Sequence, residues 1–144
     1  IGRARCEAAL KLVKPSDSVQ ETRTRLALML FGLPIPQTQY GITDSENGYT
    51  YTVDMAYPQY KVAIEYDGDH HRTSKAQWRR DQEKRGVLVG RRWLVFVATA
   101  ASIANEDARA EFAFNVARAL ASRGAVFEFH VVAMSLEELS QSLL

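Results

Sequence analysis

The chain has 144 residues, of which 47% are hydrophobic and 24% are charged, and its formal net charge is +1. These values are typical of a folded globular domain and exclude a disordered chain, which combines low hydrophobicity with high net charge. They also exclude a polycation that coats nucleic acid along its whole length, so any affinity for phosphate must be local. The single cysteine, Cys6, excludes an internal disulfide and a thiolate zinc cluster within this chain.

The sequence shows neither a membrane-spanning segment nor a signal peptide. No apolar run approaches the roughly 20 residues of a membrane helix, and the first residues lack the pattern of a signal peptide. We therefore expect a reducing, cytoplasmic location and no membrane partner. Because the chain does not begin with methionine, we also expect that residues upstream were removed, among which a DNA-reading domain could lie.

Two helices are predicted before the first strand. Residues 5–13 form a short helix that ends before Pro15, because a proline disfavours helical geometry in the residue that precedes it. A second helix covers 18–31 and ends at Gly32, a residue type that readily adopts the left-handed conformation of a helix end.

Three strands are predicted next. Residues 35–42 lead through a polar turn at 44–48 into residues 49–56, where two sets of side chains alternate. Residues 60–67 form the third strand, and its apolar centre predicts burial on both faces. We expect an antiparallel meander.

A helix over 74–89 and an apolar strand over 93–97 complete the predicted sheet. A strand, a helix of this length and another strand form a crossover unit with parallel strands and a right-handed connection. We therefore expect an α/β fold with a mixed sheet of about four strands flanked by helices. It would form one domain over 1–144, with a core at about 18–98.

The C-terminal part is predicted to be mainly helical. A long helix covers 101–123 and ends at Gly124. In the tail, residues 126–132 alternate like a strand, whereas residues 135–144 look helical and open with a capping pattern of Ser135 and Glu138.

Acidic residues gather on the second and third predicted strands. If residues 58–59 are a two-residue hairpin loop, Asp54 lies directly across from Ala63 and diagonal to Glu65. Diagonal Cβ atoms are roughly 7 to 8 Å apart, so both carboxylates could reach one ion, and the period of two adds Asp67 on the same face. Hard oxygen ligands favour Mg²⁺ or Mn²⁺. The alternative is a structural role, in which these acids pair with arginines of the following helix.

Asp54, followed by the segment 65–68 and His71, resembles the PD-(D/E)XK nuclease superfamily, and within it uncharacterised bacterial proteins related to very-short-patch repair endonucleases. Those proteins share an acidic residue on a first helix, an aspartate on a strand, a Glu-x-Asp-Gly-x-x-His segment, and a helix with an aspartate before a further strand. The matching residues here are Glu21, Asp54, Glu65, Asp67, Gly68, His71, Asp81 and Trp93. The resemblance covers about 18–98 and implies a restriction-endonuclease-like fold.

The resemblance also implies a metal-dependent DNA endonuclease. Asp54 and Glu65, with the backbone carbonyl of Tyr66, would bind the Mg²⁺ or Mn²⁺ ion, and Glu21 would add a carboxylate or hold a metal-bound water. The bound ion would assist the hydrolysis of a phosphodiester. His71 could act as a general base or contact phosphate, and its alternative is an ordinary loop histidine.

The catalytic lysine of this superfamily is missing from its usual place. It normally lies two residues after the glutamate, where this chain has Asp67. On the following helix, however, Gln77, Asp81, Lys84 and Leu88 share one face at 100° per residue. Lys84 is therefore predicted to serve the water or phosphate that the missing lysine would have served.

Several of these residues also have structural interpretations. Glu21 completes a capping box that begins at Ser18, and it could pair with Arg25 one turn later. Trp78 and Trp93 are expected in the core, and His130 is expected to be structural. A set of basic residues beside the acidic cluster is predicted to contact the DNA backbone, although such runs are often solvated helix faces: Arg72, Lys75, Arg79, Arg80 and Arg85.

Three functions remain open on the sequence. The first is the DNA endonuclease. The second is a catalytically weak or inactive nuclease-fold module of a DNA-binding regulatory or antitoxin-like protein. The third is a folded domain that binds a protein partner and has no role with nucleic acid.

Overall fold

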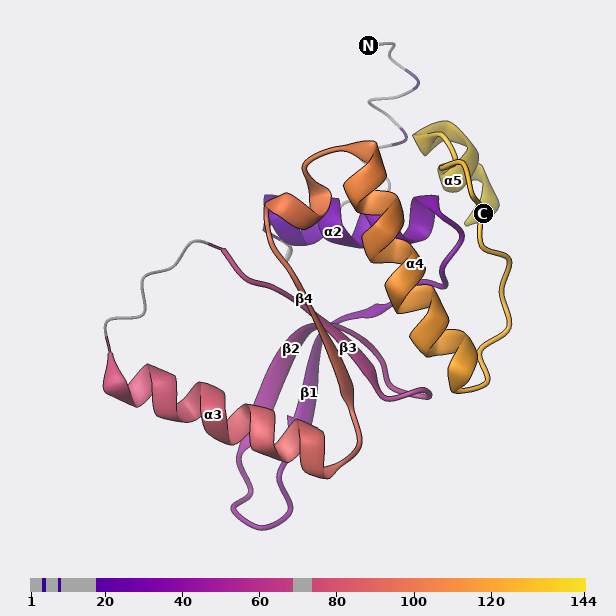
Figure 1. Cartoon of the computed structure of the whole chain (residues 1–144). Coiled ribbons are helices and arrows are strands. Elements are labelled where there is room, and N and C mark those ends of the chain that lie inside the picture. The colour runs from indigo at the N-terminus through magenta and orange to yellow at the C-terminus, as the bar shows by residue number, and fades with distance from the viewer. Residues whose placement is uncertain (1–3, 5–7, 9–17, 69–73) are drawn as a thin grey trace. The chain divides into compact units, whose positions relative to one another are not determined.

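The computed structural model describes residues 4, 8, 18–68 and 74–144 (Figure 1). The chain divides into two compact units. One unit combines Ile1–Ile35 with Ala100–Leu144, and the other is Pro36–Thr99. No helix in the described part of the chain is long and apolar enough to cross a membrane.

The unit Pro36–Thr99 contains a four-stranded sheet in the order β1-β2-β3-β4 and the helix α3. Strands β1 and β2 pair antiparallel, as do β2 and β3, whereas β3 and β4 pair in parallel. The predicted α/β class with a mixed sheet of four strands is thus confirmed. The bounds are β1 Gln37–Thr43, β2 Thr50–Tyr57, β3 Val62–Tyr66, α3 Lys75–Gly90 and β4 Leu94–Ala98.

The centre of β3 is the best covered part of this unit. Val62, Ala63 and Ile64 are completely buried, as the continuous apolar run predicts. Leu88 of α3 and Trp93 belong to the same core cluster as Ala63. This packing places the C-terminal half of α3 near β3, whose one acidic residue is Glu65.

The hairpin between β2 and β3 is longer than predicted. Its loop is the four residues 58–61, in which the Tyr60 N–H donates to the Tyr57 carbonyl at 3.0 Å and the Lys61 N–H donates to the Pro58 carbonyl at 3.3 Å. Lys61 adopts a left-handed conformation with φ of 52°.

Burial raises the pKa of the Tyr57 hydroxyl above its ordinary value, so Tyr57 stays neutral.

The longer loop changes the predicted register. Ala63 pairs with Ala56, and Ile64 pairs with Met55, so the prediction that Asp54 faces Ala63 is wrong by two residues. An offset of two keeps every side chain on its predicted face. Continued by one pair, the observed register sets Asp54 directly opposite Glu65, which is closer than the diagonal arrangement expected.

The unit formed by Ile1–Ile35 and Ala100–Leu144 is helical in its described part. The predicted helix at 18–31 is confirmed as α2, Val19–Leu30, with Ser18 as its N-cap. The predicted C-terminal helix is α5, Leu136–Ser142, and Ser135 and Glu138 form its capping box. Of the short helix expected at 5–13, only Ala8 lies among the described residues, and it is helical and buried.

The predicted single helix over 101–123 is wrong. A 3₁₀ turn, η1 at Ala101–Ile103, is followed by a separate helix, α4 at Glu106–Ser122. Asn105 separates them with an extended backbone, and its side chain accepts a hydrogen bond from the Ala108 N–H at 2.8 Å. The Asn105 side chain thereby satisfies one of the free backbone N–H groups at the start of α4. A continuous helix would have no free N–H groups at this position.

The strand considered at 126–132 is absent, since the described residues 125–135 contain no strand. This segment instead runs along the end of α2. The His130 N–H donates to the Phe31 carbonyl and the Met134 N–H donates to the Leu30 carbonyl, each at 2.7 Å. The rings of Phe31 and Phe129 stack with centroids 5.9 Å apart. The alternating residues therefore belong to a loop, and the N–H groups of this loop pair with carbonyl groups at the C-terminal end of α2.

Candidate functional site

Asp54 ends the hydrogen-bond ladder between β2 and β3. Its Oδ2 accepts a hydrogen bond from the backbone N–H of Tyr66 at 2.8 Å, and the side chain is half-buried. The next N–H along the chain, that of Asp67 just after β3, points to the other side and donates to the Ala98 carbonyl at 2.7 Å. Because a strand residue directs its N–H and C=O to the same neighbour, the Tyr66 carbonyl lies on the side of Asp54.

Glu65 contacts a lysine from α3. The Lys84 Nζ forms an ion pair with Glu65 Oε2, and the side chains are 19% and 28% exposed. The two residues are 19 positions apart in sequence, so the fold and not local helix geometry brings them together. Helical periodicity predicts which face of α3 carries Lys84, and the structure places Glu65 against that face.

A cavity of about 360 Å³ lies beside this pair. Its size is in the range of small-molecule sites in proteins. Its apolar lining residues are Leu88, Val89, Trp93, Val95 and Val97, and its polar ones are Glu65, Tyr66, Asp67, Asp81, Lys84 and Arg85. The lining thus combines apolar surface with charges of both signs.

The carboxylates suit a hard divalent ion in part. Among the described residues, no three side chains of His, Cys, Asp or Glu are gathered closely enough to hold a metal, so the site rests on two carboxylates. Asp54 and Glu65 face each other in the register, and Mg²⁺ commonly takes only one or two protein carboxylates and keeps several waters. Two carboxylates are compatible with Mg²⁺ or Mn²⁺, whose binding here stays a prediction, and Lys84 would compete for one oxygen of Glu65.

The other predicted site residues are spread over the chain. Glu21 lies in the first turn of α2, in the other unit, where its N–H donates to Ser18 Oγ at 3.1 Å; its part in the site stays a prediction. Asp67 is exposed at the cavity. His71 and Arg72 lie outside the described residues. The remaining basic residues, Lys75, Arg79, Arg80 and Arg85, are all exposed on α3.

The expectation that Trp78 lies in the core is wrong, whereas the same expectation for Trp93 is confirmed. Trp78 is 57% exposed and Trp93 is 9% exposed. Of the residues of α3, all of which the structure describes, only Leu88 is buried. One sequence signal could have identified this: residues 75–82 contain only Ala76 and Trp78 as apolar residues, too few to hold that part of the helix against a sheet.

Two known proteins are similar to part of this chain. The chain is 29% identical over 112 residues to two proteins of Mycobacterium tuberculosis, from strains CDC 1551 / Oshkosh and ATCC 25618 / H37Rv, both named only as uncharacterised. The match covers 75% of this chain and 41% of each relative. No family model matches the chain, and no solved structure matches it.

Proposed function

We propose that this chain is a metal-dependent DNA endonuclease that hydrolyses phosphodiester bonds. Its proposed active site consists of Asp54, Glu65 and Lys84. The observation that supports the proposal most is the ion pair between Lys84 and Glu65. Through this ion pair, α3 brings a cation to the two acidic residues. The chain has Asp67 two residues after the glutamate, where the superfamily normally has its lysine. Phosphodiester hydrolysis needs such a cation near the growing negative charge.

Each side chain would have a distinct part in this chemistry. Bound Mg²⁺ or Mn²⁺ would lower the pKa of a water molecule and stabilise charge on the phosphate. Asp54 and Glu65 would hold the ion, and Asp54 is fixed for this by its hydrogen bond to Tyr66. Lys84 balances the charge of Glu65 and could donate a hydrogen bond to a phosphate oxygen.

The exposed basic residues of α3 would bring DNA to the site. Lys75, Arg79, Arg80 and Arg85 lie on the helix that carries Lys84. Contacts of this kind position the backbone of DNA and carry no base specificity. Holding the scissile phosphate beside the carboxylates would raise the rate of hydrolysis through proximity alone.

A second function is favoured by the same ion pair. If Lys84 permanently neutralises Glu65, the pair is a structural contact between α3 and β3, and the chain is a nuclease-fold module that binds DNA without cutting it. Among the described residues, no group of three His, Cys, Asp or Glu side chains could hold a metal, which is consistent with this alternative.

Substitution of Lys84 tests the proposal. We expect Lys84→Met to slow Mg²⁺-dependent nicking of supercoiled plasmid by roughly 10²-fold, because one charged donor is typically worth this much in a transition state. Lys61→Met is the matched control, since Lys61 is an exposed lysine of the same unit that donates to the Arg91 carbonyl at 3.2 Å. Equal nicking rates for Lys84→Met and wild type would remove Lys84 from the mechanism. DNA binding with no nicking by wild type in Mg²⁺ or Mn²⁺ would favour the module.

A further inference from the structure

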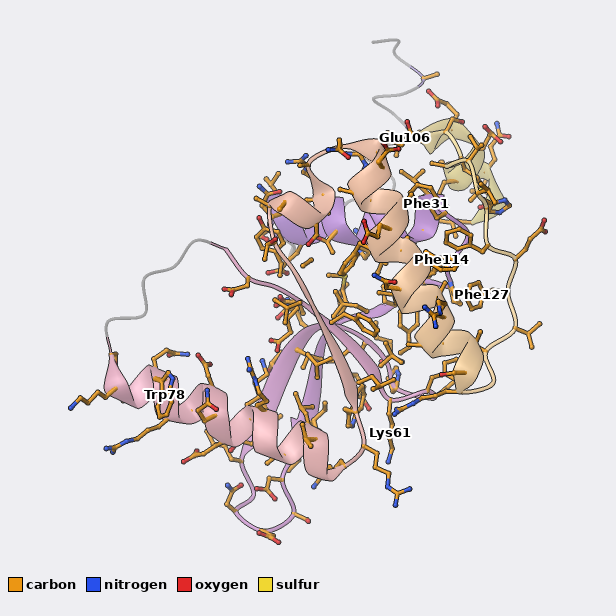
Figure 2. The ribbon with its side chains drawn as sticks, in the orientation of Figure 1. Phe31, Lys61, Trp78, Glu106, Phe114 and Phe127 are labelled. Carbon is orange, nitrogen blue, oxygen red and sulfur yellow. The ribbon has the colours of Figure 1, made fainter. Side chains whose placement is uncertain are left out.

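We propose that Trp78 stacks on an unpaired base, and that the nucleic acid bound along α3 therefore has single-stranded character. The proposal deepens the proposed function, because it names the substrate class of the same face. Figure 2 shows Trp78 on the N-terminal part of α3, which extends beyond the strands of its unit. Its side chain is 57% exposed although tryptophan is normally well covered.

Trp78 lies close along α3 to residues that line the cavity, although Trp78 itself is not part of the lining. Asp81 and Arg85 follow it by three and seven residues and both line the cavity beside Glu65, and such spacings place residues on one side of a helix. Lys84 is six residues from Trp78, about 9 Å along the helix axis. A strand that contacts both residues would therefore run along α3 between Lys84 and Trp78.

The charges around Trp78 match a nucleic-acid backbone. Lys75, Arg79 and Arg80 are exposed within one turn of it, and Asp81 is the nearest acid along the helix. A positively charged surface with an exposed aromatic ring is the arrangement that single-strand-binding proteins use, because every base has a face on which the ring can stack. In an intact duplex, the base faces are hidden by stacking. Trp78 could then contact only the backbone.

The two tryptophans of the chain make the proposal measurable. Trp93 is buried, and its ring centroid is 6.0 Å from that of Tyr40. Trp93→Phe leaves Trp78 as the single tryptophan reporter. In EDTA, which prevents metal-dependent cleavage, we expect a single-stranded oligothymidylate to quench the emission of this variant, and a blunt-ended duplex of equal charge to leave it nearly unchanged.

Affinity measurements give the second arm. Stacking on one base is worth about 1 to 3 kcal/mol, so Trp78→Ala should weaken binding of the single strand about 5- to 150-fold and binding of the duplex less than about twofold. Trp78→Phe should retain most of the affinity, because a ring remains. Tyr49→Ala is the matched control, since Tyr49 is a 50% exposed aromatic residue of the same unit and does not line the cavity.

The outcomes separate this inference from the proposed function. Equal losses on single strand and duplex in Trp78→Ala, or no loss on either, would overturn the stacking role and leave the endonuclease proposal standing. Absence of single-strand binding by wild type at low salt would also overturn it. Selective loss of single-strand binding in a protein that never nicks DNA would support the stacking role and count against the endonuclease.

Discussion

Asp54→Asn and Glu65→Gln should each lower the rate of Mg²⁺-dependent plasmid nicking by at least about 10³-fold. Each variant removes one of the two carboxylates that would hold the ion, and a bound ion supplies several kcal/mol of transition-state stabilisation. The rate of conversion of supercoiled to nicked plasmid, measured at equal protein concentration with and without EDTA, gives the result.

The choice of amide variants separates catalysis from folding. Asparagine at 54 keeps an oxygen that accepts the hydrogen bond from the Tyr66 N–H, so the end of the ladder is preserved. Asp54→Ala loses this bond as well and should cost about 1.5 to 3 kcal/mol in the free energy of unfolding. Glu83→Gln is the matched control, because Glu83 is an exposed acid next to Lys84. A folded Glu65→Gln protein that nicks DNA within threefold of wild type would contradict the assignment.

Gly32→Ala should destabilise the protein by about 2 to 5 kcal/mol. Gly32 has a φ of 96°, which costs an L-residue roughly 1 to 2 kcal/mol. An added Cβ would also overlap the carbonyl oxygen of Glu128 and lie 2.5 Å from Cδ2 of His130, and overpacking typically costs about 1 to 3 kcal/mol. Urea denaturation followed by circular dichroism measures the loss.

Gly124 offers a close control for this effect. Its φ is 95°, and an added Cβ would meet nothing within 4 Å. Gly124→Ala should therefore cost only the backbone term, about 1 to 2 kcal/mol. The difference between the two variants isolates the close approach of the 128–130 loop to the end of α2. Equal losses in the two variants would show that this loop does not pack on Gly32 in solution.

The hairpin shows what alternation can and cannot predict. The period of two places Asp54 and Glu65 on the right faces, because any even offset in register preserves the face. Loop length is a different matter, since Lys61 takes the left-handed conformation that a sequence normally signals with glycine or asparagine. A two-residue loop at 58–59 is therefore the natural prediction, and the four-residue loop brings the two acids closer than that prediction does.

Helix α3 shows a comparable limit. Periodicity predicts that Lys84 and Leu88 share a face, and both are found against β3 or its core. The same pattern cannot tell how far the sheet extends under the helix, so the exposure of Trp78 was missed. The break at Asn105 was also missed, because residues with good helix propensity stand on both sides of it.

The site is only partly predictable for a physical reason. Asp54, Glu65 and Lys84 come from three elements of one unit, β2, β3 and α3, whose packing follows from apolar patterns in the sequence. Glu21 belongs to the other unit, and its capping bond to Ser18 is local. Local patterns predict the cap well, whereas a role in the site depends on packing that no local pattern encodes.

Titration calorimetry with Mn²⁺ is the most direct test that Asp54 and Glu65 together hold an ion. Wild type should bind Mn²⁺, and Asp54→Asn and Glu65→Gln should each weaken binding by at least about tenfold, because each removes one charged ligand. Lys84→Met should bind Mn²⁺ at least as tightly as wild type, since the competing ammonium is gone from Glu65. Mn²⁺ affinity that is unchanged in both carboxylate variants would contradict the account.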